Sequence, residues 1–289
     1  MSHALRESVL SFGCGGEPLL GILAEGQAAA GAQDLAVIII VGGPQYRAGS
    51  HRQFVLLARH LAMAGIPALR FDYRGMGDAA GEARDFLNVD EDIRAAIDAL
   101  QAGHPAIRRV VLWGLCDAAS AALLYQDGMR DARVAGLVLA NPWVRSVASL
   151  ARAQVKHYYW QRLREPAFWR KLLGGGVGLR ALRDLGRNVR LSRGSKTASD
   201  APLSFQDRMA RGLKGFKGPV LLVLSGADIT AQEFLEQATS SPAWQGLLAR
   251  PGLQRLDLPT ADHTFSSTPD ADAVNAGTTR WIMQTLSSS

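Results

Sequence analysis

The sequence lacks any long hydrophobic run. Its 289 residues are 47% hydrophobic, yet the longest compact apolar run, residues 35–41, is far shorter than the roughly 20 residues that span a bilayer. The first twelve residues carry charges and lack the apolar segment, roughly 7–15 residues long, of a secretory signal peptide. The sequence therefore predicts no membrane span and a cytoplasmic location.

Cysteine and histidine are also scarce. The two cysteines, Cys14 and Cys116, lie so far apart in sequence that a cytoplasmic protein is expected to keep them as separate thiols. The six histidines are scattered, without the Cys/His spacing of a zinc site, and no internal repeat or heptad pattern is present. We expect neither a metal nor a cofactor.

The positive charge is concentrated in one segment. Residues 143–217 hold 17 Lys and Arg against 4 Asp and Glu, whereas the rest of the chain has 15 against 22. Such a segment indicates an anionic substrate, an acidic carrier or peripheral contact with an anionic membrane; a solvated, Arg-rich helical face is the alternative. No nucleic-acid partner is expected.

Strand-like and helical segments alternate along most of the chain. The strand candidates are 9–12, 19–24, 35–41, 67–71, 109–113, 134–140, 219–225 and 253–258, with helical patterns at 51–64, 90–100 and 117–126. The first two flank a Gly-Cys-Gly-Gly turn and are typical of an antiparallel edge pair, while the others are apolar runs typical of strands buried on both faces. This order predicts an α/β fold with a doubly wound, mostly parallel sheet.

One long interruption follows the sixth strand candidate. It holds aromatic and basic material at 155–160 and 168–171, a Gly-rich piece at 174–178 and a polar stretch at 192–200. We interpret 143–217 as a helical cap inserted into a core formed by 1–142 and 218–289. Its aromatic side chains either pack the cap onto the core or lie at a membrane surface.

A candidate nucleophile stands where the fifth strand candidate ends. Gly114-Leu115-Cys116-Asp117-Ala118 follows the strand and opens an Ala-rich helix, which is the small-x-nucleophile-x-small pattern of a nucleophile elbow. The turn is expected to place the Cys116 sulfur above the helix N-terminus, where a thiolate is favoured. The alternative is a small buried cysteine at a strand-helix junction. Cys14 is interpreted as a structural or incidental thiol.

The other two members of a triad follow later strands. His263 lies in the loop after the last strand candidate and Asp228 directly after the preceding one. The order nucleophile, acid, histidine is the one that accompanies a nucleophile elbow, with the acid fixing the imidazole tautomer. Asp262 is the rival acid, although a residue adjacent to His263 would more often point away.

An oxyanion hole requires two backbone donors. The amide of Asp117, which follows the nucleophile, is one candidate, and the loop after strand candidate 35–41 should supply the other. Pro44 has no N–H, so Gly43 is the first choice in that loop and Gln45 the second.

The Asp117 side chain complicates this site. A carboxylate beside Cys116 opposes thiolate formation unless it is turned away or paired with a cation. We predict Arg47 and Arg74 as candidate partners.

These motifs resemble the α/β-hydrolase superfamily over essentially the whole chain. The matching pieces are Gly42-Gly43-Pro44, the Phe-Asp-Tyr-Arg-Gly-Met-Gly segment at 71–77, the elbow at 114–118, Gly226-Ala227-Asp228 and Ala-Asp-His-Thr-Phe at 261–265. Residues 42–51, Gly-Gly-Pro-Gln-Tyr-Arg-Ala-Gly-Ser-His, combined with the elbow, look like the type 1 hydrolases associated with the exosortase A system. That resemblance implies a bacterial enzyme linked to exopolysaccharide and exosortase gene clusters.

The combined pattern predicts acyl chemistry. His263 would take the Cys116 proton, the thiolate would attack an acyl ester or thioester, and water would resolve the acyl-enzyme. The substrate is expected to be a small molecule or an acyl group on a carrier such as coenzyme A or acyl carrier protein. Two alternatives stay open, an acyltransferase with the same acyl-enzyme and a non-catalytic module that binds an acyl carrier or partner.

Overall fold

The computed structural model describes residues 5–26, 34–43, 45–145 and 203–286. Contacts divide the chain into a core unit, Met1–Val144 with Ser204–Ser289, and a second unit, Arg145–Leu203. The aromatic, Gly-rich and polar pieces that the sequence analysis assigned to the cap lie outside the described residues. The core unit carries the predicted catalytic residues.

The described part of the core forms an eight-stranded sheet. Its strands are β1 (Arg6–Cys14), β2 (Glu17–Glu25), β3 (Leu35–Ile40), β4 (Ala68–Phe71), β5 (Arg109–Leu115), β6 (Val134–Ala140), β7 (Val220–Ser225) and β8 (Leu253–Leu258). The spatial order is β1-β2-β4-β3-β5-β6-β7-β8, with β1 and β2 antiparallel and the remaining strands parallel to one another. This arrangement confirms the predicted antiparallel edge pair and the mostly parallel sheet.

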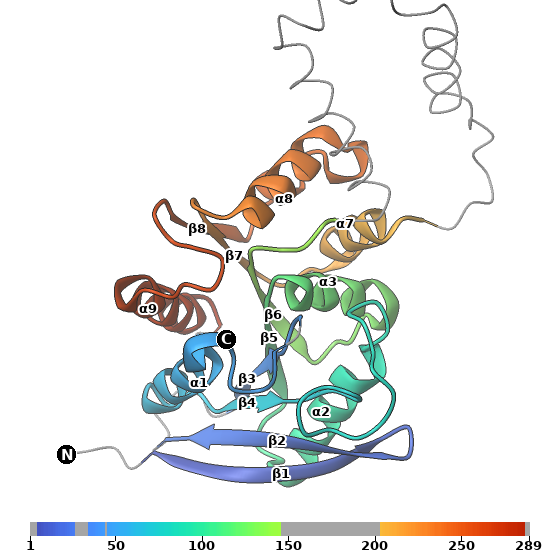
Figure 1. Ribbon diagram of the computed structural model, residues 1–289, viewed down its shortest axis with the longest axis vertical. Coiled ribbons are helices and arrows are strands. Elements are labelled where there is room, and N and C mark those ends of the chain that lie inside the picture. The colour runs from blue at the N-terminus through green and yellow to red at the C-terminus, as the bar shows by residue number, and fades with distance from the viewer. Residues whose placement is uncertain (1–4, 27–33, 44, 146–202, 287–289) are drawn as a thin grey trace, which may run out of the picture. The chain divides into compact units, whose positions relative to one another are not determined.

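Helices cover both faces of the sheet (Figure 1). They are α1 (Gln53–Met63), α2 (Asp90–Gly103), α3 (Asp117–Met129), α7 (Phe205–Gly215), α8 (Ile229–Ser240) and α9 (Thr268–Thr285). One hydrophobic cluster joins the sheet to α1 and α9, and the other joins it to α2, α3, α7 and α8. Every residue of β3 and β7 is buried, as expected for strands covered on both faces, whereas β8 at the sheet edge contains no buried residue.

The first α-helix begins later than predicted. The apolar pattern placed it at 51–64, but a short 3₁₀ turn, Ser50–Arg52, precedes α1, which starts at Gln53. His51 and Arg52 have φ angles of 52° and 60°, which an α-helix cannot contain. The backbone in this segment is therefore set by the turn after β3 rather than by helical periodicity.

Helix α7 lies inside the segment predicted to be the cap, yet it packs on the core. Gln206 Nε2 donates to the Val144 carbonyl at 2.9 Å, and Trp244 Nε1 donates to the Gln206 carbonyl at 3.1 Å. Arg211 pairs with Asp127 of α3. These contacts place α7 in the core unit, so the 217 boundary of the cap is too late and the insert ends before Ser204.

No helix among the described residues is long and apolar enough to cross a membrane. Within the same ranges, no three His, Cys, Asp or Glu side chains gather in a way that could hold a metal ion.

Candidate active site

Cys116 occupies a sharp turn between β5 and α3. Its φ and ψ angles are 62° and −124°, a conformation that non-glycine residues rarely adopt and that marks a functional constraint. The turn folds back so tightly that a Cβ on Gly114 would lie 2.5 Å from the carbonyl of Ala118. Gly114, the small residue at the first position, thus has the role that the sequence pattern assigned to it.

Gly114→Ala is expected to destabilise the protein by about 1–3 kcal/mol, because the added methyl meets backbone rather than a flexible side chain. Urea unfolding gives the free energy directly. Gly215→Ala is the matched control, since a Cβ there meets nothing within 4 Å. Equal unfolding free energies for the two variants would show that the turn at Cys116 accommodates the added methyl without cost.

His263 and Asp228 meet at the carboxyl edge of the sheet. Asp228 follows β7 and caps α8, accepting from the amides of Thr230 at 3.0 Å and Ala231 at 3.2 Å. Its Oδ2 also lies 2.8 Å from His263 Nδ1, in the loop after β8. The two amides fix the carboxylate, which in turn orients the imidazole so that Nε2 is free for other chemistry.

The rival acid, Asp262, turns back onto its own loop. Its Oδ1 accepts from the amides of Thr264 and Ser266, both at 3.0 Å, and its Oδ2 accepts from the Ser266 hydroxyl. The hydrogen-bond partner of His263 Nδ1 is the Asp228 carboxylate. The geometry therefore favours Asp228 as the acid and leaves Asp262 a role in shaping the loop.

The proton affinities of these groups are shifted in the direction expected for a catalytic pair. The hydrogen bond to Asp228, followed by one with the Cys116 side chain, raises the pKa of His263 to about 10. Burial raises the pKa of Asp228, but its hydrogen bonds to His263 and to the amides of Thr230 and Ala231 bring it below the usual value. The imidazole is thus held protonated at neutral pH, beside the Cys116 sulfur.

A buried polar network fastens the histidine loop to the sheet. Asn141, just after β6, donates from Nδ2 to Ser225 Oγ at 2.8 Å and to the His263 carbonyl at 3.1 Å. The Ser225 hydroxyl donates to the Asp262 carbonyl at 2.8 Å, and its amide donates to Asn141 Oδ1 at 2.9 Å. Asn141 and Ser225 were not predicted from the sequence, where the only signal was a polar residue directly after β6 and another at the last position of β7.

Asn141→Ala is expected to lower kcat/KM by about 10- to 100-fold, because His263 loses an anchor and small displacements of a catalytic group are costly. Ester hydrolysis and His263 NMR line width would report the effect. Asn88→Ala, which removes an exposed side-chain hydrogen bond to Asp85, is the control. Unchanged turnover in Asn141→Ala would assign this network to folding alone.

The predicted oxyanion loop is hydrogen-bonded to Asp117, the residue after the predicted nucleophile. The Gly43 amide donates to Asp117 Oδ2 at 2.9 Å. Gln45, the second choice, accepts through Oε1 from Gln53 Nε2 at 3.4 Å, and Pro44 lies outside the described residues. Gly43 thus lies beside the elbow, as the prediction requires, but its N–H is already donated.

The predicted arginine partners of Asp117 pair elsewhere. Arg47 pairs with Asp72 and Asp78. Arg74 pairs with Asp92 at 2.9 Å and Glu91 at 2.7 Å. The predicted pairing of these arginines with Asp117 is wrong. Asp72 beside Arg47 and Asp92 beside Arg74 have no exposed surface, and a fully buried carboxylate is costly without a paired cation.

Cys14 ends β1 and is buried, with a free thiol. Burial raises its pKa, and Asp92 nearby adds to that effect. A thiol disfavoured as thiolate is a poor nucleophile, which fits the structural role predicted for it.

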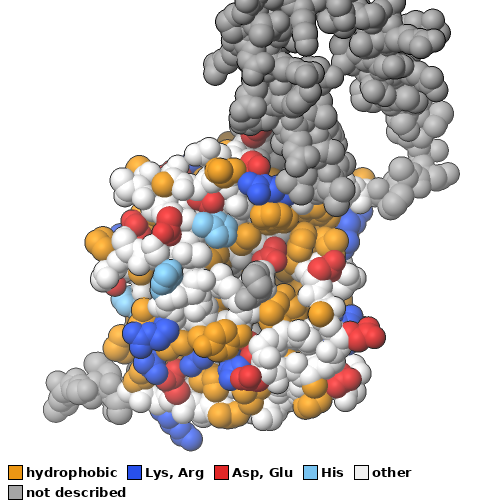
Figure 2. Space-filling view, viewed as in Figure 1, with side chains coloured by type: hydrophobic (Ala, Val, Ile, Leu, Met, Phe, Trp, Pro, Cys, Tyr) orange, Lys and Arg blue, Asp and Glu red, His pale blue; other side chains and the backbone are white. Residues whose placement is uncertain are grey.

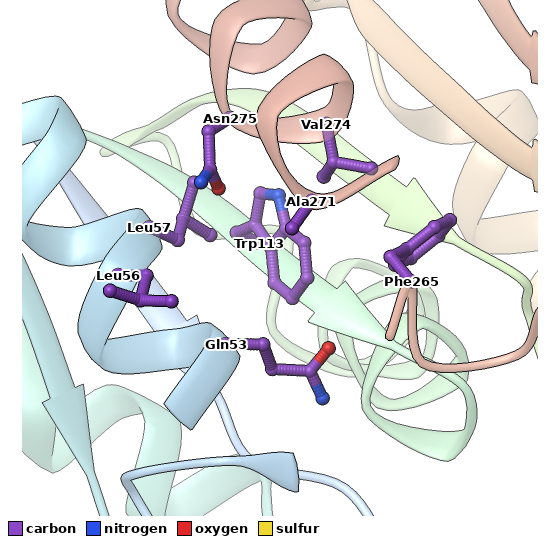
Figure 3. A pocket seen from close by; sticks show the side chains of 8 residues that line it. All are labelled: Gln53, Leu56, Leu57, Trp113, Phe265, Ala271, Val274 and Asn275. Atoms are coloured by element: carbon purple, nitrogen blue, oxygen red, sulfur yellow. The ribbon is translucent and has the colours of Figure 1, made fainter. Parts of the chain in front are cut away.

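A small pocket lies between α1 and α9 (Figure 3). Trp113 of β5 forms its floor, Phe265 of the histidine loop borders one side, and the helices contribute Gln53, Leu56, Leu57, Ala271, Val274 and Asn275. Neither Cys116 nor His263 is among its lining residues. The pocket is therefore distinct from the site of the predicted chemistry.

Comparison with known proteins gives one family match. The family model described as serine aminopeptidase, S33, matches residues 32–240. A search of the curated proteins finds no match.

Solved structures similar to this chain include several esterases. The esterase Pf2001 of Pyrococcus furiosus is 15% identical, with 97% of this chain and 93% of that chain covered and a TM-score of 0.64. Est1E of Butyrivibrio proteoclasticus, bound to ferulic acid, is 15% identical over 96% and 98%, with a TM-score of 0.60. A putative hydrolase from Agrobacterium vitis S4 is 17% identical over 96% and 99%, with a TM-score of 0.56. At these identities the likeness concerns the fold.

Proposed function

Because the chain belongs to the serine aminopeptidase S33 family of α/β hydrolases, we propose that it is a hydrolase whose nucleophile is the Cys116 thiolate. The membership confirms the superfamily predicted from the sequence. The family's description names a serine enzyme, and this chain carries cysteine at the elbow instead. We propose an acyl ester or thioester as the substrate, because a thiolate attacks such carbonyls readily.

One observation carries this proposal. Cys116 stands in the strained elbow while His263, its hydrogen-bond partner, is bonded on the opposite ring nitrogen to Asp228. The hydrogen bond to Asp228 raises the pKa of His263, which makes the imidazole a better acceptor for the Cys116 proton. On this proposal the attacking thiolate forms when that proton passes to His263.

The chemistry then follows in two stages. The thiolate attacks the acyl carbonyl carbon, and the oxygen takes up negative charge near the amides of Gly43 and Asp117. Collapse breaks the bond to the leaving oxygen or sulfur, which receives the proton from His263, and leaves an acyl-thioester on Cys116. Water, losing a proton to His263, attacks that thioester, releases the carboxylic acid and restores the thiolate–imidazolium pair.

The partner proposal rests on the basic segment at 143–217. We propose that it binds the anionic carrier of the acyl group, coenzyme A or acyl carrier protein. The face of the core seen in Figure 2 has hydrophobic and acidic side chains near its centre and Lys and Arg mainly toward its periphery. The proposed link to exopolysaccharide and exosortase pathways rests on the resemblance of residues 42–51 and the elbow.

The test is the covalent intermediate. Enzyme mixed with nitrophenyl esters of two- to eight-carbon acids, and with an acyl-CoA series, should give a burst of nitrophenol or free thiol equal to the enzyme. After acid quenching, mass spectrometry should find the acyl group on the peptide that contains Cys116. The substrate series that acylates Cys116 faster, esters or CoA thioesters, identifies the preferred leaving group. Product on an added alcohol or amine would indicate an acyltransferase. A reactive Cys116 that no acyl donor modifies would leave only the binding-module alternative.

A further inference from the structure

The Asp117 carboxyl lies between the nucleophile elbow and the oxyanion loop. Asp117 is the first residue of α3, and its Oδ2 accepts the Gly43 amide at 2.9 Å. Its Oδ1 is buried without a hydrogen-bond partner, pressed against Gly42 so closely that a Cβ there would lie 2.2 Å from it. The carboxyl thus joins two segments that are 74 residues apart in sequence.

The hydrogen bond to Asp117 occupies the Gly43 N–H, which the proposed reaction requires as an oxyanion donor. The Gly43 N–H has one proton to donate, so an acyl oxygen and Asp117 Oδ2 compete for it. A Cβ on Gly43 would meet nothing within 4 Å, which leaves open space beside its backbone. Two arrangements are therefore mutually exclusive, one with the Gly43 amide on Asp117 and one with it on the substrate.

The negative charge of the Asp117 carboxylate also opposes the proposed reaction. Arg47 and Arg74 pair with other carboxylates, so among the described residues neither neutralises Asp117. A carboxylate in this position repels both the attacking thiolate and the developing oxyanion. Burial raises the pKa of Asp117 against the opposing effects of backbone amides, including that of Gly43, and of the His263 charge, which indicates an environment unfavourable to the carboxylate.

We propose that Asp117 is a gate on the oxyanion hole: its side chain holds the Gly43 amide in the resting enzyme and is displaced by the acyl oxygen of a bound substrate. This inference rests on the proposed function. Displacement needs binding energy, and a substrate with a large carrier supplies more of it than a small activated ester. The gate selects carrier-bound acyl groups over small esters that reach the site by chance.

The test separates two effects of the Asp117 side chain, its hydrogen bond to the Gly43 amide in the oxyanion hole and its negative charge. Asp117→Ala removes the occupant, whereas Asp117→Asn removes the charge but keeps an oxygen able to accept from Gly43. Two rates are measured for each, acylation of Cys116 by nitrophenyl acetate and its alkylation by iodoacetamide, which needs the thiolate but no oxyanion hole. Asp98→Ala, which removes an exposed carboxylate on α2, is the control, and Asp117→Ser replaces the alanine variant if that unfolds.

The gate predicts that the ratio of acylation to alkylation rises about 10- to 100-fold in Asp117→Ala, the scale of one lost charge-assisted hydrogen bond. The ratio should rise clearly less in Asp117→Asn, which keeps a weaker acceptor for the Gly43 amide, and should stay near the wild-type value in Asp98→Ala. An unchanged or lower ratio in Asp117→Ala, with the wild type still acylated, overturns the gate alone. An equal rise in both Asp117 variants assigns the effect to charge and also overturns it. Alkylation without acylation in every protein overturns the proposed function itself.

Discussion

Cys116→Ala is expected to abolish ester and thioester turnover, with a loss of at least about 10⁴-fold, because no other group at the elbow can form the acyl-enzyme. Burst kinetics and intact mass would show both the lost turnover and the missing adduct. Cys14→Ala is the matched control, since that thiol is buried at the end of β1. Turnover that survives in Cys116→Ala would transfer the chemistry to another residue.

Cys116→Ser should not restore a serine hydrolase. The hydrogen bond to Asp228 is the largest cause of the raised pKa of His263, and it remains in this variant. A protonated imidazole cannot accept the hydroxyl proton, so we expect turnover about 10²- to 10⁴-fold below wild type at neutral pH. A fully active serine variant would show that the site is built for a neutral histidine.

Asp228→Asn is expected to lower kcat/KM by about 10³- to 10⁴-fold, as loss of the acid leaves the histidine in the wrong tautomer and without charge stabilisation. Asp262→Asn should change kcat/KM by less than about threefold, because its carboxylate bonds only to the loop in this arrangement. Nitrophenyl ester hydrolysis by both variants decides between the two acids. A larger loss in Asp262→Asn would reverse the assignment.

Asp228→Asn is also expected to change how the stability of the protein depends on pH. In the folded protein the pKa of His263 is about 10, above its ordinary value of 6.5. The stabilisation that the His263–Asp228 pair gives the folded state is therefore fully present below about pH 6.5 and is lost as pH rises through about 10. The difference in unfolding free energy between wild type and Asp228→Asn should therefore shrink across that interval. Urea titrations at several pH values measure it, and a difference that grows with pH would contradict the raised pKa.

Much of the fold was accessible from the sequence because it is written in local patterns. Continuous apolar runs identified β3 and β7, whose residues are all buried, and the small residues around Cys116 identified the elbow. Periodicity failed where the backbone departs from regular structure, as at His51 and Arg52. It also failed at α7, because a helical pattern does not reveal which unit the helix packs against.

By itself the sequence determined the alternation of strands and helices, the place of Cys116 at a tight turn between strand and helix, and the chain order of Cys116, Asp228 and His263. The tertiary structure decided which acid meets His263, which residues anchor its loop, and where the Asp117 carboxyl lies. Each of these is a hydrogen bond between residues 35 to 122 positions apart. Such contacts depend on which strand ends lie side by side at one edge of the sheet, and no local pattern records that register.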